Sequence, residues 1–171
     1  NILFKTPSSS KEFKEYDLFR WEILRKPIGK SIESLKDKYE DSSYHLIGVI
    51  DNKIIACGRL HFNSDNEAQI RYMAIDKNFQ RKGIGVKIIE LLEAEAKKKR
   101  INKIVLNARN HVIEFYEKSG YKAVRESMKV LILEFLIQLW KKYFSYLFCL
   151  KKSLNKFALI SSLNPNLYFT E

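Results

Sequence analysis

Residues that cross-link or interrupt small folds are scarce in this sequence. Its 171 residues include 2 cysteines, 6 glycines and 3 prolines. Cys57 and Cys149 lie far apart in dissimilar contexts, which excludes a disulfide framework and a paired metal-ligand spacing. The content of 46% hydrophobic and 30% charged residues excludes the collagen-like, low-complexity and disordered classes. We therefore expect a globular protein of a reducing cytoplasm, with no metal site.

Acidic residues are also in short supply. The 20 Asp and Glu residues face 31 Lys and Arg residues, which leaves a net charge of +11. The excess is local, because residues 77–103 carry nine basic and three acidic side chains, residues 121–171 carry eight and three, and residues 1–76 balance. A general polyanion binder would carry an even basic coat. We therefore expect no nucleic-acid partner.

The length fits one domain of ordinary size, and no long apolar stretch opens the chain, so no signal peptide is expected. Ser9 followed by Glu12 has the spacing of a capping box. Apolar residues then recur at helical intervals until Pro27, which predicts a helix over 10–26. A weaker pattern over 32–39 predicts a second helical piece.

The next segment changes to the pattern of strands. Residues 44–50 and 53–62 are apolar-rich runs on either side of Asp51-Asn52, a turn typical of a hairpin. After a second polar turn, residues 68–75 form a third run. This block predicts an antiparallel meander.

The second half alternates helices and strands. Apolar residues at helical spacing predict a helix over about 83–100, followed by a strand over 101–108. A short helix over 110–119 would end at Gly120, and Tyr121 would begin another strand. Strands separated by helices favour a parallel pair with right-handed crossovers. The predicted fold class is therefore α/β, with a mixed α+β sheet.

One loop carries a recognisable binding pattern, the segment from Gln80 to Gly85 at the start of the predicted helix. Helix starts expose unpaired N–H groups and the positive end of the helix dipole, and glycines let an anion come close to the backbone. Arg81 and Lys82 add positive charge. A dinucleotide fingerprint would need a third glycine, and a nucleotide-triphosphatase loop would need Gly-Lys-Ser/Thr. The loop predicts a pyrophosphate site.

Three motifs follow one another along the chain: Arg71-Tyr72-Met73-Ala74-Ile75, Gln80-x-x-Gly83-x-Gly85 and Phe115-Tyr116-Glu117-Lys118-Ser119-Gly120-Tyr121. In this order they resemble the motifs of the GNAT superfamily of N-acetyltransferases. The resemblance covers about residues 12–125. It implies a mixed sheet whose two central parallel strands splay apart to admit pantetheine, and transfer of acetyl from acetyl-CoA directly to a primary amine. The resemblance is also compatible with a homodimer.

The resemblance also implies where acetyl-CoA would bind. Strand backbone at Met73 and Ile75 would face the pantetheine, and amides of the loop would hold the pyrophosphate. Asn107 or Asn110 would contact the cofactor at the end of the following strand, although Asn110 also suits a helix cap. The expected cofactor-binding residues are Met73, Ile75, Gln80, Arg81, Lys82, Gly83, Ile84, Gly85, Val86, Asn107 and Asn110.

The chemistry needs a proton donor for the departing thiolate and a donor for the oxyanion. Tyr116 matches the family's general acid, and a phenol of pKa near 10 lies within about two units of a thiol near 8.5. An aromatic core residue is the alternative for Tyr116. Backbone N–H groups near Met73 are the expected oxyanion donors, because a bulged strand leaves them unpaired.

The chemistry also needs a neutral amine, and hence a base. Some family members carry a glutamate where this chain has Gln69, which cannot accept the proton. Glu67 is the nearest carboxylate and the leading candidate, with His45, His61 or an ordered water chain as alternatives. The competing interpretation places Glu67 in solvent at a turn and the histidines on the strand surface.

The resemblance ends near Arg125, and we divide the chain into an acetyltransferase domain, residues 1–127, and an atypical tail, residues 128–171. The family's last strands, with Ile-Pro-His and Met-Glu-Lys elements, are missing. One choice of codons for residues 132–141 encodes both elements in a shifted frame, which predicts a frameshift between about Arg125 and residue 132.

Two other functions stay open at this point. Gln69 and the tail are compatible with a catalytically silent acyl-CoA-binding module. The apolar segment 128–150 is compatible with a membrane-associated protein. However, Glu134, Lys141 and Lys142 would each cost about 2.5–3.5 kcal/mol in a bilayer, against about 0.3–0.6 gained per large apolar residue. We therefore do not expect membrane insertion.

Overall fold

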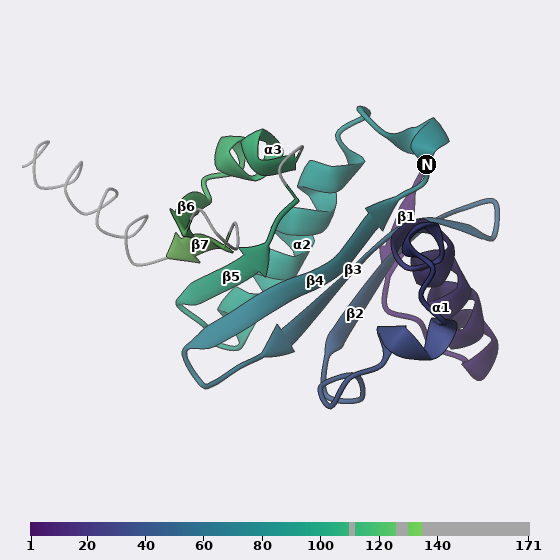
Figure 1. Cartoon of the computed structure of the whole chain (residues 1–171), viewed down its shortest axis with the longest axis horizontal. Coiled ribbons are helices and arrows are strands. Elements are labelled where there is room, and N and C mark those ends of the chain that lie inside the picture. The colour runs from purple at the N-terminus through teal and green to yellow at the C-terminus, as the bar shows by residue number, and fades with distance from the viewer. Residues whose placement is uncertain (110–111, 126–129, 135–171) are drawn as a thin grey trace, which may run out of the picture. The chain divides into compact units, whose positions relative to one another are not determined.

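The computed structural model of the chain describes residues 1–109, 112–125 and 130–134 (Figure 1). The chain divides into two compact units, residues 1–133 and 134–171, and the elements described below belong to the first, apart from Glu134, the last residue of the last strand. The predicted domain boundary at 127, the frameshift and most of the segment 128–150 fall outside the described residues and stay predictions.

In the described part, seven strands form one mixed sheet in the order β1-β2-β3-β4-β5-β7-β6. Strands β1 to β4 pair antiparallel, β4 pairs with β5 in parallel, and β6 pairs with β7 antiparallel. The sheet confirms the predicted mixed class. The strands are β1 (Leu3–Lys5), β2 (Tyr44–Ile50), β3 (Lys53–Phe62), β4 (Glu67–Ile75), β5 (Lys103–Asn107), β6 (Lys122–Arg125) and β7 (Val130–Glu134).

The helices begin and end close to the predicted positions. The first helix is capped by Ser9, whose hydroxyl accepts a hydrogen bond from the Glu12 N–H at 3.2 Å. The Glu12 carboxylate accepts a hydrogen bond from the N–H of Ser8, whereas in the predicted capping box the donor would be the N–H of Ser9. The α-helices are α1 (Ser10–Leu24), α2 (Ile84–Lys98) and α3 (Ile113–Lys118), and the 3₁₀ helices are η1 (Lys26–Ile28), η2 (Ile32–Leu35) and η3 (Lys77–Phe79).

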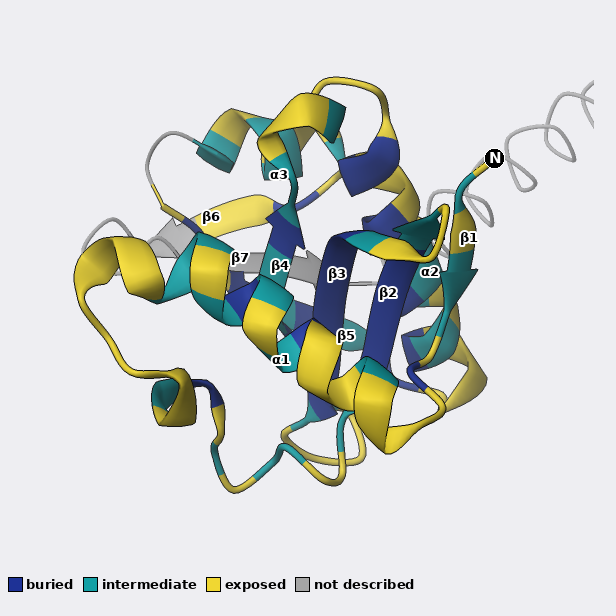
Figure 2. Ribbon diagram, turned by 90° about the vertical axis from the view of Figure 1, so that its right-hand side faces the viewer, coloured by how far each residue is buried: buried dark blue, intermediate teal, exposed yellow. Residues whose placement is uncertain are grey.

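Helices α1 and α2 cover opposite faces of the sheet. Successive side chains of a strand point to opposite faces. Cys57 of β3 belongs to a buried cluster with Tyr16 of α1, whereas a Cβ at the next residue, Gly58, would touch Ile88 and Leu92 of α2. Strands β2 and β3 are therefore buried on both sides, as Figure 2 shows, and exposed residues gather on the outer faces of the helices.

Local patterns account for the elements that the sequence predicted. Asp51 and Asn52 have φ of +48° and +60°, the conformation of a two-residue hairpin turn between β2 and β3. The predicted second helical piece is the single 3₁₀ turn η2, and α3 begins at Ile113 rather than at residue 110. Strand β1 was not predicted, because three residues are too few to show a period.

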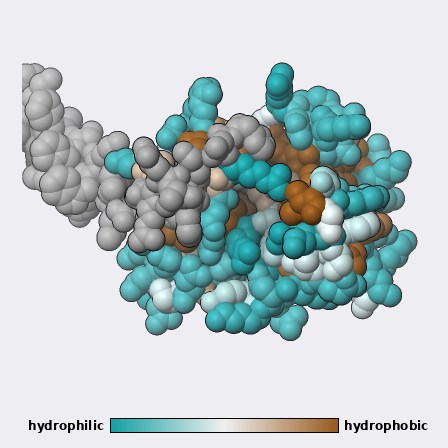
Figure 3. All heavy atoms as spheres, viewed as in Figure 1, coloured by the Kyte–Doolittle hydropathy of each residue, from teal (hydrophilic) through white to brown (hydrophobic). Residues whose placement is uncertain are grey.

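The surface on the side shown in Figure 1 is mostly hydrophilic, with hydrophobic residues in patches between hydrophilic ones (Figure 3). Among the residues that the structure describes, no helix has both the length and the apolar character needed to cross a membrane.

We predict that Gly58→Ala lowers the free energy of unfolding by about 1–3 kcal/mol, because overpacking strains a filled core. A Cβ at residue 58 would lie 2.9 Å from both Ile88 Cγ2 and Leu92 Cδ1. Urea unfolding measures the loss. In the double variant with Leu92→Ala, the loss should be smaller than the sum of the two single losses, since the shortened side chain makes room. Additive losses would contradict the close approach of β3 to α2.

Candidate functional site

The site begins where two parallel strands separate. Strand β4 pairs with β5 only from Glu67 to Ile70, opposite residues 103–106. Beyond Ile70, β4 continues to Ile75, whereas β5 ends at Asn107. Among the described residues, no further pair joins the two strands. The sheet is therefore open between them at this end.

A bulge in β4 lies at the start of this opening. Cys57 pairs with Ala74 and Arg59 pairs with Arg71, so three steps along β4 match two steps along β3. The extra residue falls at Tyr72, whose φ is +52°. This conformation is uncommon for a residue with a Cβ, and bulges occur often beside active sites.

A cavity of about 740 Å³ occupies the opening. Its walls are the end of α1, the bulged half of β4, the loop before α2, the end of β5 and one side of α3. The lining residues are Ile23, Leu24, Arg25, Gln69, Ile70, Arg71, Tyr72, Met73, Ala74, Ile75, Gln80, Arg81, Gly83, Gly85, Val86, Leu106, Asn107, Ala108, Arg109, Val112, Phe115 and Tyr116.

At one end of the cavity, the loop before α2 has the geometry of an anion site. Gly83 is the N-cap of α2, with φ of +78°, and Arg81 also has a positive φ of +60°. The first N–H groups of α2 have no partner inside the helix. The side-chain amide of Gln80 donates to the carbonyl of Ile75 at 3.2 Å, which fastens the loop to β4.

The second glycine of the loop has a packing role. A Cβ at Gly85 would lie 3.0 Å from Phe115 Cζ and 3.2 Å from Ile75 Cδ1. Glycine therefore lets α2 lie close to both α3 and β4 at the cavity wall. This contact brings the loop and α3 together.

Tyr116 lines the cavity from α3, on the side opposite β4. Its hydroxyl donates to Met73 Sδ at 3.6 Å, so the phenol and the bulged strand meet inside the cavity. Its ring packs edge-on against Phe115 and Tyr121. Burial raises the pKa of Tyr116 to about 12. The phenol therefore keeps its proton throughout the physiological range.

The structure brings most of the predicted cofactor residues to this one cavity. Lys82 and Ile84 are not part of the lining, and Asn110 lies outside the described residues. Lys82 is exposed, with its ammonium 5.2 Å from the centre of the Phe79 ring. The predicted residues that do line the cavity are Met73, Ile75, Gln80, Arg81, Gly83, Gly85, Val86, Asn107 and Tyr116.

Glu67 stands apart from this group. Its carboxylate lies 2.8 Å from Lys103 Nζ and accepts a hydrogen bond from the Asn63 side chain at 2.9 Å. These hydrogen bonds lower the pKa of Glu67, which makes it a weaker base. Glu67 is absent from the cavity lining, whereas Gln69 belongs to it.

His45 and His61, the other base candidates, are buried away from the cavity lining. His45 Nδ1 lies 3.2 Å from the Tyr16 hydroxyl oxygen, and its Nε2 lies 2.8 Å from the carbonyl oxygen of Glu40. His61 stacks on Tyr39 with ring centres 4.5 Å apart. Burial lowers the pKa of both histidines. Both side chains pack in the interior instead of lying on the strand surface.

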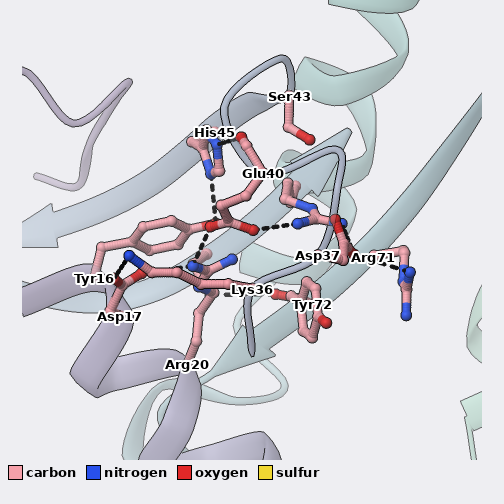
Figure 4. A network of polar contacts seen from close by, with 12 residues as sticks. Tyr16, Asp17, Arg20, Lys36, Asp37, Glu40, Ser43, His45, Arg71 and Tyr72 are labelled. Atoms are coloured by element: carbon pink, nitrogen blue, oxygen red, sulfur yellow. Dashed lines mark hydrogen bonds and ion pairs between the residues drawn. The ribbon is translucent and has the colours of Figure 1, made fainter. Parts of the chain in front are cut away.

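Sequence reasoning missed a buried ion-pair network beside the cavity (Figure 4). Arg20 of α1 and Arg59 of β3 have fully buried side chains, and both donate to the carboxylate of Glu40. Arg20 Nη2 lies 2.5 Å from Glu40 Oε1 and from Asp17 Oδ1. Arg59 Nη2 lies 2.6 Å from Asp37 Oδ2. The network joins α1, the loop before β2 and the sheet.

Opposite charges set the protonation of the network. Burial alone would raise the pKa of Glu40, but the hydrogen bond from Arg20 and the charges of Arg20 and Arg59 outweigh it and lower the pKa. Burial would also raise the pKa of Asp37, but the hydrogen bond from Arg59 and the charges of Arg59 and Arg71 outweigh it and lower the pKa. Both carboxylates therefore stay ionised at neutral pH.

The sequence held a usable signal for this network. Arg20 lies four residues after Tyr16 and three before Ile23, on the apolar face of α1, and Arg59 lies between buried positions of β3. A charged residue on a buried face requires a buried partner. Such a position predicts an internal ion pair.

The described residues contain no group of three or more His, Cys, Asp or Glu side chains that could hold a metal ion. Around the cavity, backbone amides and cationic side chains could hold a ligand. They suit an anion at the α2 end and an uncharged chain along β4.

Comparisons with known proteins agree with this geometry. The model of the Acetyltransferase (GNAT) family matches residues 6–121. Histone acetyltransferase TAP1 of Glycine max is 30% identical over 112 residues, which are 61% of this chain and 48% of that protein. Glucosamine 6-phosphate N-acetyltransferase 1 of Dictyostelium discoideum is 29% identical over 102 residues, 54% of this chain and 65% of that protein. The chain thus spans about half to two thirds of the length of these relatives.

A solved structure has the same fold. The GNAT family acetyltransferase of Elizabethkingia anophelis, solved with acetyl-CoA bound, shares 19% identity with this chain at a TM-score of 0.62. The superposition covers 78% of this chain and 98% of that one.

We predict that Glu40→Gln lowers the free energy of unfolding by about 3–5 kcal/mol, because it leaves two buried guanidinium groups without their shared carboxylate. Urea unfolding at pH 7 measures the loss. The control is Glu15→Gln, which removes an exposed carboxylate 3.9 Å from Lys11 and should cost less than about 1 kcal/mol. Equal losses in the two variants would contradict the network's role.

The same variant should change the acid sensitivity of the fold. A carboxylate whose pKa is lowered in the folded state stabilises it above the unfolded pKa of about 4, and this stability is lost as the pH falls. Between pH 7 and pH 3, Glu40→Gln should therefore lose less stability than the parent chain does.

Proposed function

The chain belongs to the acetyltransferase (GNAT) family, and we propose that it transfers an acetyl group from acetyl-CoA directly to a primary amine. The observation that carries the proposal is the cavity between β4 and β5. It joins a helix-start anion site at Gly83 to a protonated phenol at Tyr116.

The cavity fits acetyl-CoA at two places. The unpaired N–H groups at the start of α2, with Arg81 beside them, suit the pyrophosphate. The bulged half of β4, at Met73 and Ile75, lacks a β5 partner and offers its backbone to an extended pantetheine arm. When bound, acetyl-CoA supplies the acetyl thioester. This chain supplies the groups that orient it.

Two groups would stabilise the charges that develop during transfer. The bulge at Tyr72 takes backbone N–H groups out of the ladder beside Met73, where they can donate to the oxyanion. Tyr116 donates its O–H toward the departing sulfur. Its pKa of about 12 lies roughly 3.5 units above that of a thiol, so a hydrogen bond to the thiolate is favoured over complete proton transfer.

The attacking amine must lose a proton to another group. Gln69 lines the cavity and cannot accept a proton, and the carboxylate of Glu67 is held by Lys103 outside the lining. We therefore assign the proton path to ordered water leading from the cavity. The role of Glu67 as a base stays a prediction that the geometry does not support.

An amine acceptor is also consistent with one relative. The matched protein of Dictyostelium is named an N-acetyltransferase of glucosamine 6-phosphate, which carries an amino group. A catalytically silent acyl-CoA-binding module is the alternative, and Gln69 at the acceptor end favours it. Binding of acetyl-CoA without coenzyme A release across a panel of amines would support that alternative.

We predict that Gly83→Ala weakens acetyl-CoA binding about 10-fold, because a Cβ would stand at the N-cap where the pyrophosphate approaches the backbone. The control is Gly29→Ala. Both glycines have positive φ, +78° and +68°, and a Cβ at either would meet no atom within 4 Å. Gly29 does not line the cavity.

Both variants should therefore lose about 1 kcal/mol of stability, while only Gly83→Ala changes the acetyl-CoA affinity. Isothermal titration calorimetry measures the affinity, and urea unfolding measures the stability. An equal affinity in the two variants would mean that the ligand does not bind at the start of α2.

We predict that Tyr116→Phe lowers kcat about 100-fold and leaves the acetyl-CoA affinity within about twofold, because the lost hydrogen bond acts on the departing thiolate. Release of coenzyme A measures kcat. The control is Tyr44→Phe, which removes a hydroxyl at the start of β2, outside the cavity lining. Unchanged kcat in Tyr116→Phe would remove Tyr116 from the mechanism.

A further inference from the structure

The end of the cavity away from the α2 loop is lined by other elements than the loop end. It is formed by the last residues of α1 and by β4 before and at the bulge. If acetyl-CoA occupies the loop and the splayed strand, this end is left for the amine. Two cationic side chains, Arg25 and Arg71, line it beside Gln69 and Tyr72.

Tyr72 lies at the centre of a group of cations. Its ring centre lies between 4.8 and 5.3 Å from the guanidinium carbons of four arginines. Arg25 also donates from Nη2 to the Tyr72 hydroxyl at 3.1 Å. The aromatic ring offsets part of the repulsion among these cations. The four arginines are Arg20, Arg25, Arg59 and Arg71.

Each carboxylate of the network pairs with an arginine that does not line the cavity, and Asp37 also pairs with one that does. Glu40 pairs with Arg20 and Arg59, and Asp17 pairs with Arg20. Asp37 Oδ2 lies 2.6 Å from Nη2 of Arg59 and farther, 3.1 Å, from Nη1 of Arg71.

The cavity-lining arginines are left with unused donors. Among the described residues, no carboxylate pairs with Arg25, and its buried Nε has no hydrogen-bond partner. Arg71 lines the cavity, its side chain is 37% exposed, and only its Nη1 donates to a carboxylate, that of Asp37. A half-buried guanidinium group without a carboxylate partner, as at Arg25, is costly, so its place in the cavity wall is best explained by an anionic ligand.

We propose that the acceptor is a small primary amine bearing an anionic group, a carboxylate or a phosphate, which Arg25 and Arg71 bind at the α1 end of the cavity. This inference rests on the proposed function and names the substrate class of the same site. Arg71 lies two residues before Met73, at most about 7 Å along the chain. The anion would thus be bound close to the reacting centre, and would orient the amine toward it.

The test compares matched amines that differ in the anionic group. Alanine against alaninamide examines a carboxylate, and glucosamine 6-phosphate against glucosamine examines a phosphate. Coenzyme A release gives kcat/KM for each amine. We expect the anionic member of at least one pair to have the higher kcat/KM by about 10- to 100-fold. Equal values within both pairs would overturn the inference and leave the acetyltransferase activity standing.

Variants then assign the preference to the two arginines. In Arg71→Gln and Arg25→Gln, the ratio of anionic to neutral kcat/KM should fall about 10-fold or more, and Arg71→Lys should retain more of it than Arg71→Gln. The control is Lys14→Gln, which removes one exposed positive charge outside the cavity lining. Its ratio should match that of the parent chain. An equal fall in Lys14→Gln would indicate a general charge effect and overturn the inference.

A binding measurement separates failure of this inference from failure of the proposed function. Thermal shifts are recorded with each amine in the presence of coenzyme A, for the parent chain and for Arg71→Gln. Greater stabilisation by the anionic member, lost in the variant, supports the anion site even if no amine is acetylated. Equal stabilisation by both members of each pair overturns it. Acetyl-CoA binding without any turnover would contradict the proposed transfer alone.

Discussion

The left-handed backbone of Tyr72 is the constraint on which the cavity depends. It adds one residue to β4 relative to β3, and β4 loses its β5 partner at the same place. A residue with a Cβ holds this conformation at a cost of about 1–3 kcal/mol, so its surroundings must favour it. The Cys57 thiol donates to the Tyr72 carbonyl at 3.3 Å, and Arg25 donates to its hydroxyl. These contacts fix both ends of the bulged residue.

The ion-pair network also contacts the side chain of Tyr72. Arg20 and Arg59 lie over the Tyr72 ring and are themselves held by Glu40. Glu40 belongs to the irregular loop before β2, which also attaches to the sheet through Asp37 on Arg59 and through Tyr39 stacked on His61. The carboxylate thus holds the loop, the two arginines and, through them, the bulge. The interior ion pairs that join α1, the loop and the sheet therefore also support the bulge at the site.

The sequence predicted the features that rest on local patterns. Helical spacing, the Asp51-Asn52 turn and the glycine at 83 each act within a few residues, and the structure has them where expected. The bulge could not be predicted, because Tyr72 stands in an ordinary apolar run and its conformation is decided by contacts with distant residues. Glu67 was chosen by its proximity to Gln69 along the strand, but sequence alone could not show that Lys103 of β5 pairs with it.

Binding and chemistry in this site share one packing contact. The absence of a side chain at Gly85 lets Phe115 lie against the start of α2, and Tyr116 is the next residue of the same short helix. A helix of six residues has little stability of its own, so packing must hold its position. The contact with the loop, together with the Tyr116 hydroxyl on Met73, therefore places the phenol relative to both the anion site and the bulged strand. A shift of the loop would move the proton donor as well, so the residues at the start of α2 contribute to the position of the reacting centre as well as to ligand affinity.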